Sequence, residues 1–570
     1  MNKFFKILNF IGPKLLVLIF VIFTLIFIHS TGIFYRENVQ IKNHKRDKLS
    51  PFPGNSNDNI HVFVQLSDVH ISKVYKERKS ELIKFCSEVL AQIQPDVIIV
   101  SGDLTDDLIK GYSHSGPIEE EWKDYREAIN ECKKYVSHKT AWLDIRGNHD
   151  TLNIGYINDA FFKKYSESGI NNHFGSYVHY WNPNSNNSYR FVAMDLSVSP
   201  GLKIPYNFMG EYTNKVKLQV ESLLKERKSE SFNHTFMFGH YPSSAVMQRN
   251  SFLEILKESS LYMCGHLHSV MHLFQNMYAK QENGNLELEL TDWKKFRRYR
   301  VVAVDHDLVS FADLRYRFDN VSLIITNPKN SQTIINGYEP IGRIKRSTHI
   351  RILLYSDNNQ NMVKIFIDNN FLGLATQNNE NKNLYTCQWD PCKYSKLHVI
   401  RVDVYDHNND ITFCKPFSII CRYVIKSNSK KHLIKSVKQH FSTDGTIESF
   451  GFIQRFMIYN HIIGQSVKLL LAFIFFILIA IIYYRYAAVS ERDITITKNT
   501  KFFTRPFWLF CRSHTVYFIV PHILYFYIGP WAYVEVYQDK YGFIFMYGVY
   551  VDKKLISTAI TFGLSTVHVI

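Results

Sequence analysis

The sequence predicts an α/β domain, then an all-β domain and a multi-helix membrane domain, on three observations. Strand-like and helix-like segments alternate over residues 59–318, and polar clusters follow the strands. Residues 319–425 contain regularly spaced strand-like segments without helices, which is typical of a small immunoglobulin-like β-sandwich. Apolar runs long enough to span a bilayer stand near both ends of the chain.

The composition fits several domains of different kinds. A chain of 570 residues is too long for one ordinary core. Hydrophobic residues make up 46% of it and charged residues 21%, which indicates membrane segments beside a polar globular part. The formal charge of +16 is compatible with nucleic acid, anionic membranes or anionic substrates as partners. No nucleic-acid-reading motif is present and basic residues concentrate around the apolar runs, so we expect a lipid bilayer and no nucleic acid.

The first 35 residues are predicted to anchor the chain in a membrane. Residues 15–28 are apolar except for Thr24, and three lysines precede them. Such a run is either a signal-peptide core or a signal anchor, and the lack of a convincing cleavage site favours the anchor. The basic residues place the amino terminus in the cytosol and the next domain across the membrane. Residues 36–58 are polar and read as a linker.

Polar residues follow five predicted strands of the α/β domain. These strands cover residues 60–66, 96–100, 140–145, 235–238 and 262–264. Residues 77–93, 119–136 and 214–226 have helical periodicity, and residues 189–195 are a further strand. The five clusters are Asp68-Val69-His70, Gly102-Asp103, Gly147-Asn148-His149-Asp150, Gly239-His240 and Gly265-His266-Leu267-His268. In α/β folds, active sites form at the carboxyl ends of such strands.

Each cluster alone has an ordinary structural explanation. Gly147-Asn148 suits a turn, Asp103 suits a turn or helix cap, and His240 suits a loop. His266 and His268 are stronger evidence, because alternate residues of a strand share a face and paired histidines are uncommon in cores. The joint occurrence of all five clusters favours a metal site.

In this order, the motifs Asp-x-His, Gly-Asp-x-x-Asp, Gly-Asn-His-Asp, Gly-His and Gly-His-x-His resemble the calcineurin-like metallophosphoesterase superfamily. The resemblance implies a β-sandwich flanked by helices and two divalent or trivalent metal ions. The implied ligands are Asp68, His70 and His268 for one ion, Asn148, His240 and His266 for the other, and Asp103 as the bridge. Mixed Asp, Asn and His ligands suit Mn, Fe or Zn better than Mg or Ca.

The resemblance also implies roles for two residues that are not ligands. His149 matches a histidine that protonates the leaving oxygen or stabilises the transition state. Asp106 matches the position that orients this histidine, although a helix cap explains it equally well. Asp150 receives no role beyond orienting its loop.

The implied reaction is hydrolysis of a phosphate mono- or diester by a metal-bridging hydroxide. The alternative is a membrane receptor or trafficking scaffold that keeps the fold without turnover. In a second alternative, the membrane domain transports or recognises a lipid and delivers it to the phosphoesterase domain.

Motifs beyond the metal clusters resemble the transmembrane protein 62 family over residues 59–425. They lie at residues 205–208, 286–293, 297–300, 305–308, 310–313, 325–329 and 347–351. The resemblance does not supply a substrate. Asp292, Trp293 and the arginines after them either bind an anionic substrate or pack the sheet edge, and we favour packing.

The carboxyl-terminal part is predicted to be a basic linker at residues 426–465 and a multi-pass membrane domain at 466–570. Residues 467–484 and 516–534 are predicted spans, and residues 543–551 with 556–570 suggest one or two more. Basic residues between the first two spans indicate a cytosolic loop. We therefore expect a protein of an endomembrane or the plasma membrane whose catalytic domain is lumenal or extracellular.

Cysteines and glycosylation sequons bear only mildly on that location. Cys387, Cys392, Cys414 and Cys421 are clustered, which permits disulfides, though unpaired thiols are nearly as good an interpretation. The sequons at Asn186, Asn233 and Asn320 fit a lumenal domain but occur in an Asn-rich sequence.

Overall fold

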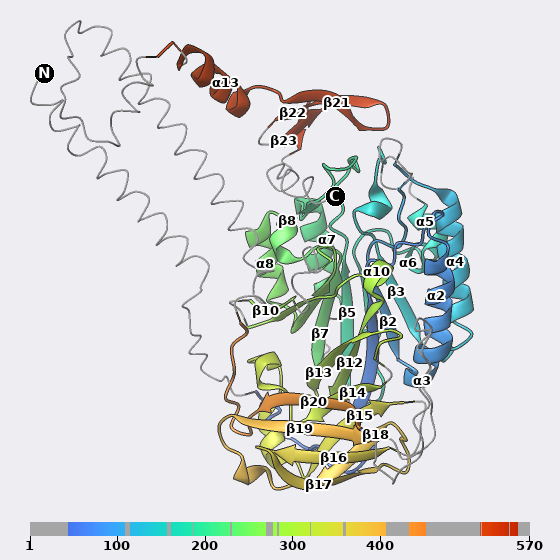
Figure 1. Cartoon of the computed structure of the whole chain (residues 1–570), viewed down its shortest axis with the longest axis vertical. Coiled ribbons are helices and arrows are strands. Elements are labelled where there is room, and N and C mark those ends of the chain that lie inside the picture. Colours follow the sequence, from blue (N-terminus) through green and yellow to red (C-terminus); the bar gives the residue numbers. More distant parts are fainter. Residues whose placement is uncertain are drawn as a thin grey trace, which may run out of the picture.

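The computed structural model describes residues 44–108, 115–156, 161–185, 187–227, 231–268, 277–281, 284–319, 321–356, 361–405, 433–451, 513–514, 516–545 and 548–556. An α/β domain and a β-rich domain are stacked end to end, and a small carboxyl-terminal sheet lies beyond the opposite end of the α/β domain (Figure 1).

Two sheets form the centre of the α/β domain. Their strand orders are β13-β12-β1-β2-β3 and β10-β11-β9-β7-β5-β4. The first sheet consists of β1 (Ile60–Leu66), β2 (Val97–Ser101), β3 (Ala141–Ile145), β12 (Arg298–Asp305) and β13 (Leu308–Arg315). The second consists of β4 (Tyr177–Trp181), β5 (Tyr189–Met194), β7 (His234–Gly239), β9 (Leu261–Cys264), β10 (Met277–Lys280) and β11 (Leu286–Glu289). Strands β1 to β3, and strands β5, β7, β9 and β11, are parallel within their sheets, so the carboxyl ends within each group lie at one edge.

Helices cover the outer faces of both sheets. The first sheet is covered by α2 (Glu77–Phe85), a π-helical turn (Cys86–Leu90), α3 (Ala91–Ile93) and α4 (Glu119–Cys132), and the second by α7 (Asn214–Lys225) and α8 (Arg249–Leu256). Between the sheets lies a core that includes Phe63, Phe191 and Phe236. Strands β2 and β7 are buried at every position, which explains their continuous apolar character. The predicted α/β sandwich flanked by helices is confirmed.

Short elements complete the α/β domain. They are the helices α5 (Phe162–Tyr165), α6 (Glu167–Ile170) and α10 (Trp293–Phe296), the 3-10 turns His149–Thr151 and Ser243–Ala245, and the strands β6 (Gly210–Glu211) and β8 (Val246–Met247).

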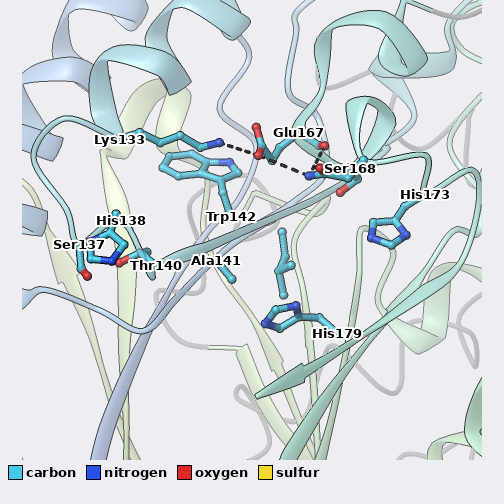
Figure 2. A pocket seen from close by; sticks show the side chains of 12 residues that line it. Lys133, Ser137, His138, Thr140, Ala141, Trp142, Glu167, Ser168, His173 and His179 are labelled. Carbon is cyan, nitrogen blue, oxygen red and sulfur yellow. Dashed lines mark hydrogen bonds and ion pairs between the residues drawn. The ribbon is translucent and has the colours of Figure 1, made fainter. Parts of the chain in front are cut away.

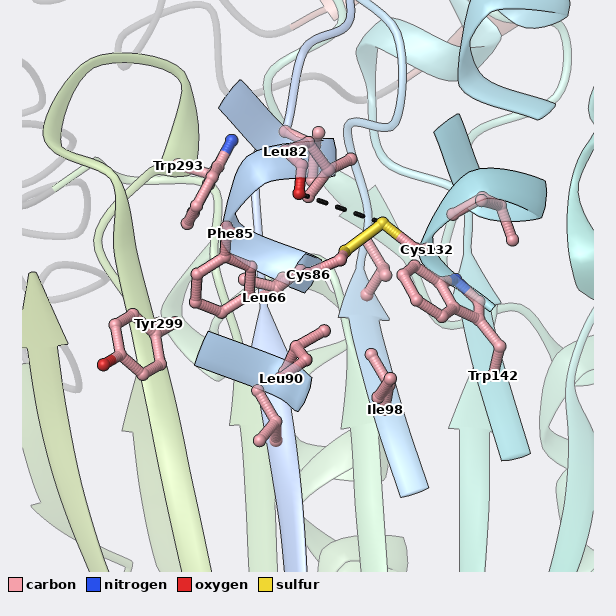
Figure 3. Close-up of a cluster of buried hydrophobic side chains, with 14 of the residues drawn as sticks. Leu66, Leu82, Phe85, Cys86, Leu90, Ile98, Cys132, Trp142, Trp293 and Tyr299 are labelled. Atoms are coloured by element: carbon pink, nitrogen blue, oxygen red, sulfur yellow. Dashed lines mark hydrogen bonds between the residues drawn. A yellow bond between two sulfur atoms is a disulfide. The ribbon is translucent and has the colours of Figure 1, made fainter. Parts of the chain in front are cut away.

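A disulfide that the sequence did not single out joins Cys86, at the start of the π-helical turn after α2, to Cys132, the last residue of α4 (Figure 3). It lies in the apolar cluster that includes Leu82, Phe85 and Trp142. In the clustered set, Cys387 and Cys392 are free thiols, while Cys414 and Cys421 lie outside the described residues. The oxidised pair is therefore in the α/β domain.

Replacing both cysteines, Cys86→Ala with Cys132→Ala, should destabilise this domain. The disulfide spans 46 residues, and closing a loop of that size lowers the entropy of the unfolded chain enough to stabilise the fold by about 4 kcal/mol. We expect a lower midpoint of thermal unfolding for the double variant under non-reducing conditions. Cys392→Ala, at an exposed free thiol, is the matched control and should leave the midpoint unchanged. An equal midpoint in both variants would contradict the prediction.

Seven antiparallel strands form the second domain, in the order β14-β15-β18-β17-β16-β19-β20. They are β14 (Ser322–Asn327), β15 (His349–Tyr355), β16 (Met362–Ile367), β17 (Asn370–Gln377), β18 (Leu384–Gln388), β19 (His398–Tyr405) and β20 (Leu433–Phe441), with 3-10 turns at Ser331–Thr333, Ile341–Arg346 and Pro391–Lys393. Inward-facing side chains such as Ile352, Ile365 and Val402 form its core. Strand β20 lies in the segment that the sequence predicts to be a basic linker. Its more exposed and less exposed side chains alternate, as they do in a strand with one face toward solvent.

The described part of the predicted linker, residues 44–58, is a strap that lies against both domains. Arg46 pairs with Asp307 in the turn between β12 and β13. Arg351 of the second domain donates from Nη1 to the carbonyls of Gly54 at 2.7 Å and Ser56 at 2.6 Å. These hydrogen bonds fix the backbone of residues 44–58, a polar segment that the sequence alone predicts to be a linker.

The carboxyl-terminal region differs from the expected helical spans. Helix α13 (Val516–Ile528) ends before the predicted span does, and a four-stranded sheet follows. Its strands are β21 (Ala532–Tyr537), β22 (Lys540–Phe545), β23 (Gly548–Val551) and β24 (Lys554–Ile556). Within the predicted span at 543–551, residues 543–545 and 548–551 belong to strands, and buried and exposed side chains alternate along them.

The remaining membrane predictions are untested. The spans expected at residues 15–28 and 467–484, and residues 557–570, lie outside the described part of the chain. Among the residues that the structure describes, no helix combines the length and the apolar character needed to cross a bilayer.

Candidate metal centre

The structure brings the seven predicted ligands together at one edge of the two sheets. Each follows β1, β2, β3, β7 or β9, so strands of both sheets supply side chains. Six of the seven are buried, and His268 is partly exposed. The set is Asp68, His70, Asp103, Asn148, His240, His266 and His268.

The backbone turns sharply where these side chains leave the strands. Five of the seven residues have left-handed φ angles, between 47° and 81°, namely Asp68, His70, Asp103, His266 and His268. Such a conformation costs a non-glycine residue roughly 1–2 kcal/mol and occurs preferentially at functional sites. Backbone bonds hold it in place, since Asp68 N donates to Gly102 O at 3.0 Å and His70 N donates to Asp103 O at 2.9 Å.

Two glycines make room for the carboxylates. A Cβ atom on Gly147 would lie 2.1 Å from Asp103 Oδ1, and one on Gly265 would lie 2.3 Å from Asp68 Oδ2. Both distances are far inside van der Waals contact. The glycines of the Gly-Asn-His-Asp and Gly-His-x-His motifs therefore allow close approach of backbone to ligand side chains.

The first ligand cluster contains Asp68, His70, Asp103 and His268, whose donor atoms all lie within 4.8 Å of one another. His268 Nε2 is 2.7 Å from Asp68 Oδ1, and His70 Nε2 is 3.3 Å from Asp103 Oδ2. His70 Nε2 is fully buried and makes no hydrogen bond with any residue that the structure describes. A buried nitrogen left without a partner costs free energy unless something binds it, which fits a metal ligand.

The second ligand cluster contains Asn148, His240 and His266, of which His240 lies next to the other oxygen of Asp103. Asn148 Oδ1 is 2.9 Å from His240 Nε2 and 2.9 Å from His266 Nδ1. The two histidine nitrogens are 3.2 Å apart, and His240 Nε2 is 3.4 Å from Asp103 Oδ1. Ligands bound about 2.1 Å from one ion lie about 3.0–3.4 Å from each other. The donor set therefore fits a second ion, with Asp103 facing both clusters.

The electrostatics of the donor set also fit bound cations. Burial lowers the pKa of His266 to about 3 and, together with the charge of Lys294, lowers that of His70 to about 3. Both imidazoles are thus neutral, as ligands must be. Burial opposes the charged form of Asp103 and Asp68, but neighbouring histidines hold both pKa values below the usual range. Burial also opposes the charge on His240, yet Asp103 and Asp68 raise its pKa to about 9, which reflects a pocket that attracts positive charge.

His149 lies beside the first ligand cluster and is held by the main chain. Its ring is 4.5 Å, centroid to centroid, from that of His70. His149 Nδ1 donates to the carbonyl of Asp106 at 2.7 Å. The hydrogen bond that holds the ring is therefore made by the backbone oxygen of Asp106.

The Asp106 carboxylate contacts other partners. Its Oδ1 is 3.0 Å from His70 Nδ1, and its Oδ2 accepts from Arg78 Nη1 at 3.1 Å. A carboxylate behind a ligating histidine fixes the ring and increases its basicity. Neither interpretation of Asp106 from the sequence included this contact with a ligand.

Asp150, for which the sequence offers no role beyond orienting its loop, joins two loops that carry predicted ligands. Its Oδ1 accepts from the backbone of Leu104 at 2.9 Å and of Thr105 at 3.1 Å, and its Oδ2 accepts from Gly147 N at 2.7 Å. The side chain is fully buried. It positions the loop of Asp103 against the loop of Asn148 and His149.

Two further side chains at the centre were missed. The ring of Phe208 lies 4.5 Å, centroid to centroid, from that of His266. The family-like run at residues 205–208 was the available signal, but it did not indicate a contact with a ligand. Arg78, from the start of α2, also donates to the carbonyl of His70 at 2.9 Å.

The alternative anion site around Asp292 has a structural explanation. Asp292 caps α10 by accepting from Lys295 N at 2.7 Å, and Trp293 is fully buried. Arg297 pairs with Glu81, and Arg300 with Asp313. These contacts support the packing interpretation.

A separate pocket of about 490 Å³ lies beside β3 (Figure 2). Its lining includes His138, Trp142, Glu167, His173 and His179. None of the seven predicted ligands lines this pocket, so it is not part of the candidate metal centre.

Family models match both the α/β domain and the β-rich domain. A model of the calcineurin-like phosphoesterase family matches residues 61–270, which include all seven predicted ligands, and a model of the TMEM62 Ig-like domain matches residues 318–422. Over 522 residues the chain is 32% identical to transmembrane protein 62 of Mus musculus, covering 90% of this chain and 75% of that protein. Over 298 residues it is 28% identical to an Arabidopsis thaliana protein with the provisional name metallophosphoesterase, covering 45% of this chain and 40% of that protein.

The likeness to a solved structure is slight. The purple acid phosphatase PPD1 from yellow lupin seeds covers 47% of this chain and 53% of its own, at 12% identity. The TM-score is 0.28, which is too low to carry an argument.

Proposed function

The chain belongs to the transmembrane protein 62 family, and on that premise we propose that it is a membrane-anchored phosphoesterase that hydrolyses a phosphate mono- or diester with two metal ions. The observation that carries the proposal is the pair of ligand clusters that share Asp103, one oxygen of which faces each cluster. Paired sites of this kind are used for in-line displacement at phosphorus.

The proposed ligands are the seven side chains of the two clusters, and Mn, Fe or Zn suits their mixture of oxygen and nitrogen donors. When bound, such ions neutralise the charge of a phosphoryl group and activate water at neutral pH. Asp103 holds the two clusters at a fixed separation, and Asp106 fixes the His70 ring from behind.

His149 is proposed to act on the leaving oxygen. Because Nδ1 donates to the Asp106 carbonyl, the proton that the ring could transfer is the one on Nε2. The ring stands next to His70, at the edge of the first ligand cluster. A proton donor here would stabilise the departing alkoxide.

The location proposed for the catalytic domain is lumenal or extracellular, in a multi-pass protein of an endomembrane or the plasma membrane. The relative's name, transmembrane protein, supports membrane attachment. The Cys86–Cys132 disulfide supports an oxidising compartment, because disulfides persist there and are rare in the cytosol.

Metal analysis and turnover of the full chain in detergent test this function against the scaffold alternative. We expect about two transition-metal ions per chain and hydrolysis of p-nitrophenyl phosphate or bis(p-nitrophenyl) phosphate. Removing metal with a chelator should abolish turnover, and Mn or Zn should restore it. Less than about one ion per chain, with no turnover of either ester, would favour a receptor or scaffold.

A further inference from the structure

The carboxyl-terminal sheet β21–β24 has one buried face. Val536, Ile544, Val549 and Val551 on that sheet are at most 3% exposed and pack with Leu202 of the α/β domain. Leu202 belongs to the loop that follows β5 and carries Phe208. This loop is called the Phe208 loop below.

The same sheet is bonded to both loops that border the candidate metal centre. Lys203 N, in the Phe208 loop, donates to Val536 O at 2.8 Å, and its Nζ pairs with Glu535 at 2.7 Å. Gln538 N donates to Asn153 Oδ1 at 2.7 Å, three residues beyond Asp150. Figure 1 shows the sheet beyond the end of the α/β domain that is opposite the second domain.

The two loops are also bonded to each other, so the sheet contacts one continuous structure. Gly201 N donates to Ile154 O at 2.8 Å, and Ile154 N donates to Gly201 O at 3.2 Å. Displacing the sheet would therefore move both the chain beyond His149 and the loop whose Phe208 ring lies on His266.

The other face of the sheet exposes a row of large apolar side chains. Tyr533, Phe543, Tyr550 and Leu555 are directly opposite one another across all four strands. Their exposed fractions are 61%, 41%, 42% and 51%. The rings of Tyr533 and Phe543 are 4.8 Å apart, centroid to centroid. We call these four residues the aromatic row, and a contiguous apolar patch of this kind marks an interaction surface.

Three features next to the aromatic row indicate that a lipid bilayer covers it. Helix α13, three residues before β21, has no charged residue and exposes Phe518 by 69% and Ile528 by 66%. Lys553 is exposed in the turn between β23 and β24, where it complements anionic headgroups. Apolar sequence flanks the described region on both sides, at residues 467–484 and 556–570. Tyrosine is enriched at such membrane–water boundaries.

We propose that the sheet β21–β24 seats its aromatic row on a lipid bilayer while its buried face holds the two loops of the metal centre, so that the substrate is a phosphate ester of a membrane lipid. This substrate class rests on the proposed phosphoesterase function. The seating itself does not, because it depends only on the two faces of the sheet.

Photo-crosslinking tests the seating without reference to activity. The full chain is reconstituted in vesicles of phosphatidylcholine and phosphatidylserine that include a phospholipid with a diazirine near its headgroup. We expect lipid adducts on peptides covering residues 531–556 and none on β16 or β17 of the second domain. Adducts confined to residues outside 531–556, or cross-links from this sheet to another protein or a second copy of the chain, would overturn the seating.

Substrate turnover in the same vesicles tests the substrate class. The variant with Tyr533→Ser, Phe543→Ser and Tyr550→Ser should lose at least about tenfold in turnover of bilayer phosphatidic acid, a monoester, or phosphatidylserine, a diester. Its kcat/KM for soluble p-nitrophenyl phosphate should stay at the wild-type value, because all three side chains point away from the loops. The matched control is Phe371→Ser with Leu374→Ser, at exposed apolar residues of β17, which should change neither activity.

The outcomes separate this inference from the proposed function. Wild-type chain that hydrolyses the soluble ester but neither lipid, or an aromatic-row variant that hydrolyses lipids as well as the control does, would overturn the substrate class. Wild-type chain that hydrolyses nothing but carries lipid adducts on 531–556 would overturn the phosphoesterase and support the seating. Thermal unfolding of each variant checks that the surface changes leave the fold intact.

Discussion

Asp103→Asn should lower turnover of p-nitrophenyl phosphate by about 10³-fold or more, a loss of about 4 kcal/mol in transition-state stabilisation. Asp103 faces both ligand clusters, with Oδ2 toward His70 at 3.3 Å and Oδ1 toward His240 at 3.4 Å. The amide keeps the shape of the side chain but removes one negative charge and replaces one ligand oxygen with a nitrogen that cannot bind metal. We therefore expect metal content to fall from about two ions to one or fewer per chain.

The control for this variant is another buried carboxylate of the same sheet. Asp305→Asn, at the end of β12, removes the ion pair with Arg351 at 2.8 Å and should lower the thermal unfolding midpoint. It should leave metal content and kcat unchanged, since Asp305 is not part of either ligand cluster. An Asp103→Asn chain that retained two ions and wild-type turnover would show that Asp103 does not bridge the clusters.

The candidate site could be predicted from the sequence because its residue types recur after strands. Asp68, His70 and the histidines at 266 and 268 follow apolar runs, and parallel strands bring such ends to one edge. What the sequence could not predict is how the chain turns there. Asp68, Asp103 and His266 have left-handed φ angles, which few non-glycine residues adopt, so residue type alone does not predict them.

The contacts of the residues beyond the ligands could not be predicted for a similar reason. The position of Asp106 matches an orienting residue, yet its carbonyl contacts His149 and its carboxylate contacts His70. Motif spacing gives the position of a residue but does not say which of its atoms is used. For Asp150 the spacing gave no partner at all. Its carboxylate accepts hydrogen bonds from three backbone N–H groups on two loops that only the fold brings together.

The boundaries of the fold were harder to predict than its centre. Residues 44–58 look like a linker because they are polar, and their order comes from Asp307, Arg343 and Arg351 far along the chain. Residues 543–551 look like part of a span because both faces of their strands carry apolar side chains, aliphatic ones such as Ile544 on the buried face and aromatic ones such as Phe543 on the exposed face. Exposed aromatic side chains such as Tyr550 make this segment as apolar as a membrane span, although it forms strands. Its composition therefore predicts a helical span that the structure does not contain there.

His149→Ala should lower kcat by about 10²–10⁴-fold while metal content stays at the wild-type value. The imidazole belongs to neither set of proposed ligands, and its backbone N–H, which donates to Asp103 Oδ1 at 2.9 Å, is kept in the variant. If the ring is a proton donor, the loss should be greater for alkyl phosphates, whose leaving group needs a proton, than for p-nitrophenyl phosphate. An equal loss for both esters would indicate that the ring stabilises charge instead.

Asp106→Asn is the variant that separates orientation of His149 from support of the metal. The carbonyl that holds His149 Nδ1 is unchanged by this substitution, whereas the carboxylate behind His70 Nδ1 is lost. We therefore expect metal affinity to fall by about 10–100-fold, with kcat close to wild type once metal is saturating. A low kcat at saturating metal, together with the leaving-group dependence of His149→Ala, would instead mean that the Asp106 carboxylate acts on His149 during the reaction.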